Sequence, residues 1–293
     1  MSRKLTDILV KNFVHGIQKF RRMIPRNKFG DYLIHLERFL TAHGRFPGKT
    51  LLGFHDTLFH VKVSGECINP MRRYVTDKEN VKQYIAETIG DQCNVPTFAI
   101  LRSRGDILEY NYPTRCVIKP THASGITILR KSGEAVDASK ISEWLEIDYY
   151  ELTRERNYHG LTPKVIVEPF VFDHDAPDDY RFFCVNGVPK VILYDQNDDT
   201  IERFRSVLNS DWRQLPFSLK CEQRTPPERP ACLQEMLEAA AQLAKPFDFI
   251  RVDFYTDGNE FRVGELTNCH AAAMQTFVPA DSEKWADEFL FNK

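Results

Sequence analysis

The chain has 293 residues, of which 42% are hydrophobic and 27% charged, enough to bury the cores of two or three subdomains. No apolar run reaches the about 18 residues that a membrane-spanning helix needs, and the N-terminus lacks the features of a signal peptide, so we expect a cytoplasmic protein. The seven cysteines are scattered without a Cys-x-x-Cys pair, which argues against a disulfide framework and against a thiolate zinc site.

The net charge of −2 is unevenly distributed along the chain. Residues 1–28 contain eight Lys or Arg and one acid, Asp7, so this segment carries +7 and the remainder −9. Apolar residues at helical spacing, including Leu5 and Phe13, predict a basic amphipathic helix that ends before Pro25. Two interpretations stay open: the helix docks on the protein body, or it makes a peripheral contact with an anionic polymer or the anionic inner face of the membrane. No nucleic-acid motif accompanies it, so nucleic acid is not an expected partner.

Helices and strands then alternate in a way that is typical of α+β subdomains. We expect a helix over residues 31–42, and another that begins at the capping box Thr76-Asp77-Lys78-Glu79 and ends at Gly90, where a left-handed residue belongs. Later helices are expected near residues 138–150 and 232–245. Short β-like runs cover residues 97–101, 116–119, 126–129, 165–171, 180–185 and 188–194.

Residues 249–268, FIRVDFYTDGNEFRVGELTN, form a predicted hairpin whose charges do not fit an ordinary surface strand. With a three-residue loop at Asp257-Gly258-Asn259, Arg251 lies opposite Glu265 and shares one face with it and with Asp253. A two-residue loop would instead bury Glu265 without a partner. Two converging carboxylates favour a Mg²⁺ site that also holds phosphates. The alternative is a plain Arg251–Glu265 salt bridge with Asp253 solvated.

Three further segments place polar groups at strand ends. Lys119 ends an apolar strand and precedes THASG, a loop of small residues suited to folding over a phosphate, although a lysine that reaches solvent is the plain alternative. VIVEPFV ends in Glu168-Pro169, where proline removes a ladder donor and frees the neighbouring backbone for a ligand edge. DYRFFCVNGVPKVI places Asp179 and Arg181 on one side of a strand. Taken singly, each is more often a strand with one solvated face.

Together and in this order, these segments resemble the ATP-grasp superfamily, and within it the TupA-like proteins, which are similar to the teichuronopeptide biosynthesis protein. The resemblance covers roughly residues 70–270 and is carried by TDKENVKQYIAETIG, VIKPTHASG, VIVEPFV, DYRFFCVNGVPK, DWRQLPF, and FIRVDFY followed by GELT. It implies an α+β ATP-grasp fold in which two α+β subdomains hold a nucleotide. The expected division is a helical, basic N-terminal segment (1–75), a small subdomain (76–164) and a C-terminal subdomain with the metal site (165–293).

The resemblance also implies roles for individual residues. Glu168 would accept from the adenine amino group, the backbone of Phe170 and Val171 would contact the adenine edge, and Asp179 and Arg181 would reach the ribose, the metal-linked network or a phosphate. The third metal ligand stays open between the two residues that follow Glu265-Leu266. The implied sets are Arg251 and Lys119 for catalysis; Lys119, Ser124, Glu168, Phe170, Val171, Asp179 and Arg181 for ATP; and Asp253, Glu265 and either Thr267 or Asn268 for Mg²⁺.

The chemistry implied by the resemblance is that of a carboxylate–amine ligase. A substrate carboxylate attacks the γ-phosphate of ATP to give an acyl phosphate and ADP, and an amine then displaces phosphate to leave an amide. The expected substrates are an amino acid or amine and a carboxylate of a cell-surface polysaccharide or a peptide-like product. Two alternatives remain open, a phosphotransferase that acts on a hydroxyl and a nucleotide-binding protein without turnover.

The sequence departs from the family pattern near the expected reaction centre. Relatives often read Glu-x-Asn at the metal, whereas this chain reads GELTN, and CHAAAM (269–274) stands where relatives often have a Pro-Gly-rich loop. His122 and His270 lie near these segments. For both, ordinary packing or solvent exposure is the preferred interpretation, and contact with a substrate is the alternative. The departures predict an unusual choice of substrate.

Overall fold

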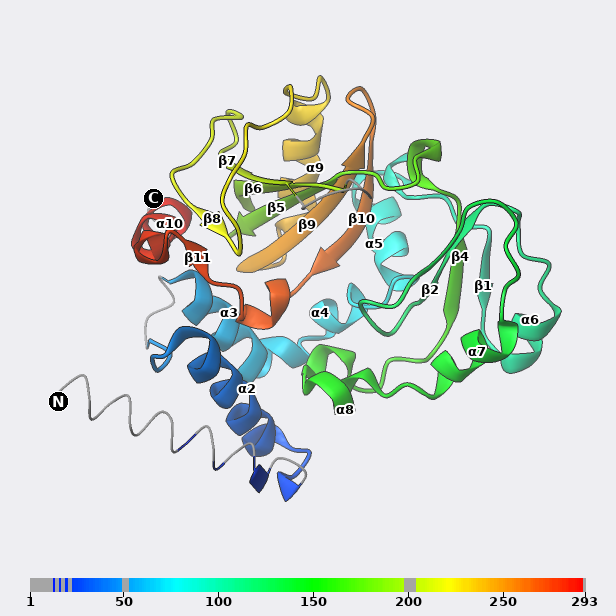
Figure 1. Cartoon of the computed structure of the whole chain (residues 1–293), viewed down its shortest axis with the longest axis horizontal. Helices are drawn as coiled ribbons and strands as arrows, with labels where there is room; N and C mark the ends of the chain where they lie inside the picture. The colour runs from blue at the N-terminus through cyan, green and yellow to red at the C-terminus, as the bar shows by residue number, and fades with distance from the viewer. Residues whose placement is uncertain are drawn as a thin grey trace.

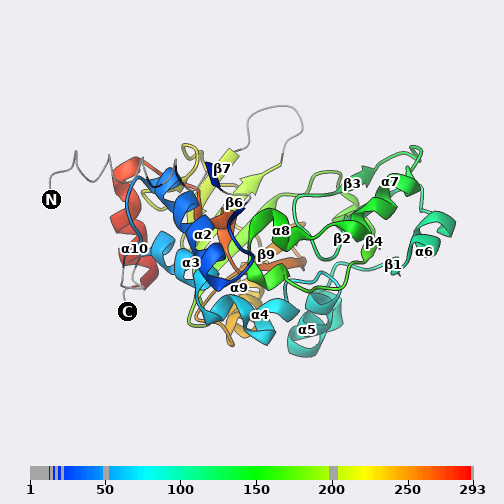
Figure 2. The same cartoon turned by 90° about the horizontal axis from the view of Figure 1, so that it is seen from below.

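The computed structural model describes residues 23–48, 53–197 and 204–291, together with Phe13, Gly16, Lys19 and Phe20. Its two main β-sheets lie in separate lobes, and the helices of the N-terminal third lie beside the larger lobe (Figure 1 and Figure 2). The basic helix predicted before Pro25 falls almost entirely outside the described residues, so its docking partner stays a prediction. Among the described residues, we find no helix whose length and apolar character would carry it across a bilayer.

The smaller lobe contains a four-stranded antiparallel sheet in the order β1-β4-β2-β3. Its strands are β1 (Ala99–Leu101), β2 (Cys116–Pro120), β3 (Ile128–Arg130) and β4 (Val165–Glu168). Helices α6 (Arg104–Glu109) and α7 (Ala138–Ser142) cover one face with apolar side chains such as Ile107. Because side chains alternate along a strand, Lys119 and Glu168 project from the opposite face.

The larger lobe contains a five-stranded antiparallel sheet in the order β10-β9-β5-β6-β7. Its strands are β5 (Asp179–Val185), β6 (Val188–Gln196), β7 (Phe204–Leu208), β9 (Phe249–Thr256) and β10 (Phe261–Thr267). Helices α5 (Asn80–Ile89) and α9 (Leu233–Ala244) pack on one face, in a core that includes Phe182 and Val252. The charged residues that alternate with this core project from the other face.

A second core lies at one end of the larger sheet, where helices from both ends of the described chain meet. Helix α3 (Phe54–Val63) and helix α10 (Glu283–Phe291) both contribute apolar side chains to it, and Phe54 lies 6.0 Å from Phe249 between ring centroids. Helix α2 (Lys28–His43) packs beside α3. Among the described residues, the remaining α-helices and strands are α4 (Pro70–Tyr74), α8 (Tyr149–Thr153), β8 (Ser218–Leu219) and β11 (Phe277–Val278).

Two expected boundaries are wrong. The division at residues 164 and 165 separates β4 from its own sheet, since β4 pairs with β1 and β2. The expected boundary between residues 75 and 76 places α5 in the small subdomain, yet Tyr84 and Ile85 on this helix belong to the core of the larger sheet. The single helix predicted over residues 138–150 is also broken, because Asp148 caps α8 by accepting from the backbone N–H of Glu151.

The capping box predicted at residues 76–79 does not form. Asp77 accepts instead from the backbone N–H groups of Glu79 and Asn80, at 2.9 and 3.1 Å, and α5 begins at Asn80. Gly90 has a positive φ of 99°, but its ψ of 146° is not that of a left-handed helical residue. The helix therefore lies where the sequence predicts it, but its N-terminal hydrogen bonds and the backbone conformation at its C-terminus differ from the prediction.

The 249–268 hairpin has the predicted face but not the predicted register. The predicted three-residue loop is wrong: Thr256 pairs with Phe261, so the loop has four residues, 257–260. The ladder shifts once more at Gly264, and the two shifts together place Glu265 opposite Asp253 rather than opposite Arg251. This bulge requires glycine, because a Cβ at position 264 would lie 2.7 Å from the ring of Tyr255. Since Arg251 and Asp253 are two residues apart on one strand, all three charges still share a face.

Candidate functional site

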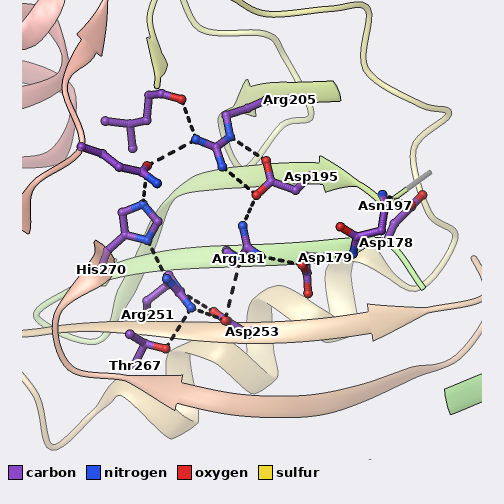
Figure 3. Close-up of polar contacts among 12 residues, drawn as sticks. Asp178, Asp179, Arg181, Asp195, Asn197, Arg205, Arg251, Asp253, Thr267 and His270 are labelled. Carbon is purple, nitrogen blue, oxygen red and sulfur yellow. Dashed lines mark hydrogen bonds and ion pairs between the residues drawn. The ribbon is translucent and has the colours of Figure 1, made fainter. Parts of the chain in front are cut away.

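A row of charged side chains crosses the face of the larger sheet opposite α5 and α9 (Figure 3). The register sets their order: Glu265 pairs with Asp253, Asp253 with Arg181, and, one strand further, Asp195 with Arg205. Figure 3 shows Arg205, Asp195, Arg181 and Asp253 linked by hydrogen bonds and ion pairs across four strands. The alternation of signs limits repulsion in this row.

Arg251, on β9 beside Asp253, makes several contacts with this row and its surroundings. Its Nε donates to Asp253 at 2.6 Å, and Nη2 donates to Asp253, to Glu265 at 3.1 Å and to the hydroxyl of Thr267 at 2.9 Å. Its Nη1 lies 2.5 Å from Nδ1 of His270. Arg251 and Asp253 are buried, whereas the Glu265 side chain keeps 41% of its surface exposed. The Glu265 carboxylate is therefore accessible to a ligand.

The charges around Arg251 do not balance. Burial raises the pKa of Asp253 to about 7, because Arg251 offsets only part of the desolvation and Glu265 adds repulsion. Burial would also raise the pKa of Glu265, but Arg251 and Lys78 lower it below its usual value. A cation with oxygen ligands would relieve the excess negative charge, and Mg²⁺ is such a cation. Within the described chain, no three His, Cys, Asp or Glu side chains gather into a metal site, so further ligands would have to be other oxygens of the protein or of the substrate.

The structure does not bring Asn268 to the two carboxylates. Its Oδ1 accepts from Arg72 at 3.2 Å, and its Nδ2 donates to the Arg72 carbonyl and to the Thr76 hydroxyl at 3.1 and 3.0 Å. Thr267, on the same face as Glu265, donates its hydroxyl to that carboxylate at 3.0 Å. Of the two residues left open by the sequence, Thr267 lies where a third oxygen ligand is needed, and the expectation for Asn268 is not supported.

On the smaller sheet, Lys119 and Glu168, expected at the phosphates and at the adenine, bind each other, and an additional lysine joins them. Lys119 Nζ lies 2.6 Å from one oxygen of the buried Glu168, and Lys82 Nζ on α5 lies 2.6 Å from the other. Burial would raise the pKa of Glu168, but the two lysines lower it, and burial lowers the pKa of Lys82. Both oxygens of Glu168 thus hold lysines, a role the sequence did not indicate.

Lys78 lies where the two lobes approach each other. Its Nζ donates to the carbonyl of Ala123, and burial lowers its pKa, partly offset by Glu265. It lines a cavity of about 310 Å³ together with Ser124 of the THASG loop, Arg251 and Glu265. Lys78 and Lys82 both stand in the segment TDKENVKQ, so two lysines at a spacing of four residues are the sequence signal for this part of the site.

The predicted adenine contacts lie in the connection between the sheets. Phe170 follows β4, and its ring lies 4.3 Å from the guanidinium of Arg115. The carbonyls of Phe170 and Val171 accept from the backbone N–H groups of Asp173 and His174, at 3.3 and 3.0 Å. These two carbonyls are thus used within a turn, and the structure leaves the proposed adenine contact to their N–H groups.

Asp179 and Arg181 lie in the charged row but bind each other. Asp179 accepts from Arg181 at 2.5 Å and from Asn197 at 3.2 Å, and burial raises its pKa despite Arg181. Arg181 Nε lies 3.9 Å from Asp253, so it is next to the carboxylate pair. Asp195 is missing from the predicted site because the predicted strand ends at residue 194, whereas β6 continues to Gln196.

A left-handed turn, residues 270–273, borders the site. Ala271, Ala272 and Ala273 have φ values of 45°, 56° and 61°, which cost roughly 1 to 2 kcal/mol each for residues with a Cβ. Lys62 donates to the Ala272 carbonyl at 3.1 Å, and His43 donates to the Ala273 carbonyl at 2.7 Å. Side chains of α2 and α3 thus hold the carbonyls of this turn.

The support of the turn extends to the C-terminal helix. His55 on α3 donates to the Gln275 carbonyl at 2.6 Å, and its other ring nitrogen lies 2.8 Å from Glu283 on α10. Arg45 also binds Glu283, at 2.8 Å. His122 is different: it is buried in the smaller lobe, 3.2 Å from the carbonyl of Trp144, and lies outside the site.

The Glu283 contacts predict a stability effect that depends on pH. Burial would raise the pKa of Glu283, but His55 and Arg45 lower it to about 2. When the pKa of a carboxyl is lower in the folded state than in the unfolded state, its ionised form stabilises the fold. This contribution is complete above the unfolded-state pKa and is lost as the pH falls toward 2. We expect Glu283→Gln to lower the unfolding free energy by about 3 kcal/mol at pH 7. Below about pH 4.5 the loss should become smaller as the pH falls.

Urea unfolding of the wild type and of Glu283→Gln at pH 7, 5 and 3.5 checks this expectation. Glu288→Gln, on the exposed side of the same helix, is the matched control and should change little at any pH. A Glu283→Gln effect that is equally large at pH 7 and 3.5 would contradict the assigned electrostatic cause.

Two lobes, one with Lys119 bound to Glu168 on its sheet and the other with Asp253 and Glu265 on its sheet, form the arrangement expected of an ATP-grasp fold. A family model described as TupA-like ATPgrasp matches residues 61–290, and the chain therefore belongs to the TupA-like ATP-grasp family. The fold and family expected from the sequence are confirmed.

Solved structures similar to this chain include an L-amino acid ligase from Bacillus licheniformis, with a TM-score of 0.43 and 16% identity over 83% of this chain and 55% of that one. Another is a D-alanine-D-alanine ligase from Helicobacter pylori, with a TM-score of 0.40 and 14% identity over 68% of this chain and 53% of that one. The chain thus spans about half the length of these relatives. No curated protein matches it.

Proposed function

We propose that this chain is an ATP-dependent carboxylate–amine ligase that forms an amide through an acyl phosphate. The observation that carries the proposal is the cluster in which the buried Arg251 joins Asp253, Glu265 and Thr267, beside a cavity that Lys78 and Ser124 also line. Such a cluster suits a reaction in which negative charge moves between a phosphate and a carboxylate.

In this proposal the lysines bind the phosphates of ATP. Lys119 and Lys82 are held side by side by Glu168, and Lys78 lies beside the cavity. Asp253, Glu265 and Thr267 would hold Mg²⁺, which when bound supplies charge neutralisation at the transferred phosphate. Arg251 orients the attacking carboxylate and stabilises the charge that develops on its oxygens.

The substrates proposed are an amino acid or amine and a carboxylate of a cell-surface polysaccharide or peptide-like product. Support for this part comes from the family resemblance alone. A location at the inner face of the membrane would follow if residues 1–28 bind anionic lipid.

The experiment that tests the function is the release of ADP and phosphate from Mg·ATP. Amino acids would be supplied singly and in pairs with carboxylic acids, with Glu265→Gln as the inactive control. Equal release of ADP and phosphate that requires both substrates supports the ligase. ADP without phosphate would favour a phosphotransferase, and ATP binding without any release would contradict turnover with these substrates.

The lysine pair makes a separate prediction about nucleotide affinity. We expect Lys119→Met to weaken binding of a non-hydrolysable ATP analogue about tenfold or more, because a charge-assisted contact to phosphate is lost and Glu168 keeps one lysine instead of two. Isothermal titration calorimetry measures this directly. Lys140→Met, an exposed lysine on α7, is the matched control, and equal affinities for the two variants would exclude Lys119 from the nucleotide site.

A further inference from the structure

A second and larger cavity lies on the other side of Arg251 and His270. Its volume is about 730 Å³, within the range of small-molecule sites, and Arg251 and Ala271 line both this cavity and the first one. The left-handed turn at residues 270–273 therefore forms a wall shared by two adjoining spaces. The cluster around Arg251 can be reached from either side.

The floor of the second cavity is a fixed network of donors. Arg205 donates to both oxygens of Asp195 at 2.6 and 2.7 Å, and Arg181 also donates to Asp195, so this buried carboxylate is shared by two guanidinium groups (Figure 3). Burial would raise the pKa of Asp195, but Arg205 and Arg181 lower it, which keeps it ionised. Asp195 thus fixes both arginines and does not repel an anion above them as a free carboxylate would.

His270 and Gln275 connect this floor to Arg251. The pKa of His270 is well below its usual value because of burial and the neighbouring Arg251, so the ring is neutral. Arg251 must donate to Nδ1, and Nε2–H therefore donates to Gln275 at 2.9 Å. Gln275 in turn accepts from Arg205 at 3.3 Å. The arginines of the floor and of the reaction centre are held at a fixed separation.

The rim of the cavity is the segment 220–224, which is attached at both ends. The backbone N–H of Lys220 donates to Thr276, and that of Arg224 donates to Arg205, both at 2.9 Å. Lys220 is exposed and has a φ of 74°, a conformation that favours glycine and that marks functional positions when another residue adopts it. Among the described residues, its ammonium has no hydrogen-bond or ion-pair partner.

The charge lining this cavity is positive. Arg181, Arg205, Lys220, Arg224 and Arg251 line it against two acids, Asp195 and Glu222. Because Asp195 is already shared by two arginines, the ammonium of Lys220 is left facing a space that adjoins Arg251. A carboxylate placed there would gain a charge-assisted contact without displacing any pair described here.

We propose that this cavity binds a substrate with two carboxylates, one activated beside Arg251 and the second bound by Lys220 at the rim. The proposal rests on the proposed function, because it assigns the activated group to the ligase reaction. The ligand class is a dicarboxylate, and either an acidic sugar or an acidic amino acid supplies that chemistry. Lys220 is then the residue that distinguishes a diacid from a monoacid.

The test compares pairs of acids that differ by one carboxylate. Galactarate is paired with galacturonate for the sugar source, and N-acetylglutamate with N-acetylglutamine for the amino-acid source. Binding is measured by calorimetry on the full chain with Mg²⁺ and a non-hydrolysable ATP analogue present. We expect the diacid of one pair to bind about tenfold more tightly than its monoacid. The pair that shows the preference identifies the source.

The variant Lys220→Met gives the decisive comparison. It should reduce the diacid-to-monoacid ratio to near one while leaving monoacid affinity and ATP-analogue affinity unchanged. Lys140→Met should keep the wild-type ratio. An undiminished ratio in Lys220→Met, or no diacid preference in either pair, overturns the proposal. Loss of the proposed function is distinguishable, because it would appear as failure of wild-type protein to bind the ATP analogue, which is measured first.

Discussion

Replacing Glu265 by Gln, or Asp253 by Asn, is expected to lower the turnover rate about a thousandfold, because a metal ion contributes several kcal/mol to transition-state stabilisation. Asp253→Asn should not lower the unfolding free energy, whereas Glu265→Gln should lower it modestly, because Arg251 and Lys78 stabilise the ionised Glu265 and lower its pKa. Asp253 and Glu265 face each other across the hairpin, and burial with this repulsion already raises the pKa of Asp253 to about 7. Neutralising Asp253 therefore removes repulsion from the folded state.

Coupled assays of ADP release, with urea unfolding of the same preparations, measure both halves of this expectation. Glu260→Gln is the matched control, since Glu260 is an exposed carboxylate in the same hairpin. Normal turnover in Glu265→Gln would remove the carboxylate pair from the reaction. A loss of turnover accompanied by unfolding would assign the pair a structural role only.

Replacing Arg251 by Met is expected to lower both turnover and stability. Turnover should fall about a hundredfold to a thousandfold, as for other removed donors that stabilise developing negative charge. The unfolding free energy should fall by roughly 3 to 5 kcal/mol, because Asp253 remains buried without its bidentate partner. Arg251→Lys should restore little, since a single ammonium cannot bind Asp253, Glu265 and His270 at once.

The double variant Arg251→Met with Asp253→Asn separates the two effects. It should regain most of the lost stability, because the unpaired buried charge is gone, but it should stay inactive. Arg213→Met, an exposed arginine between β7 and β8, is the matched control. Stability that is equally low in the single and double variants would show that packing, and not charge, causes the loss.

Strand alternation is sufficient to predict that Arg251 and Asp253 share one face, because the backbone repeats every two residues. Glu265 joins them for a reason that was not predicted: the loop is one residue longer than expected, and the bulge at Gly264 returns Glu265 to the same face. The register was not predictable, because the bulge at Gly264 depends on how closely the ring of Tyr255 approaches the neighbouring strand. Alternation along β10 also places Thr267, and not Asn268, on the face of Glu265.

Other parts of the site depend on contacts between distant segments. Asp195 and Arg205 meet through the pairing of β6 with β7, and β7 has no strong strand pattern of its own. Lys82 reaches Glu168 because α5 packs on the larger sheet while its lysine faces the smaller one. Neither arrangement follows from local periodicity, since sheet order and helix docking are decided by the whole core.

The left-handed turn at residues 270–273 has a consequence for changing substrate choice by mutation. Its carbonyls are bound by Lys62 and His43, which are separated from it by more than 200 residues of sequence. A loop of another conformation would not place its carbonyls against these donors, so variation of the loop alone would leave Lys62 and His43 without their acceptors. Selection for new substrates should therefore randomise the loop together with its contacts on α2 and α3, so that compensating pairs are sampled as units.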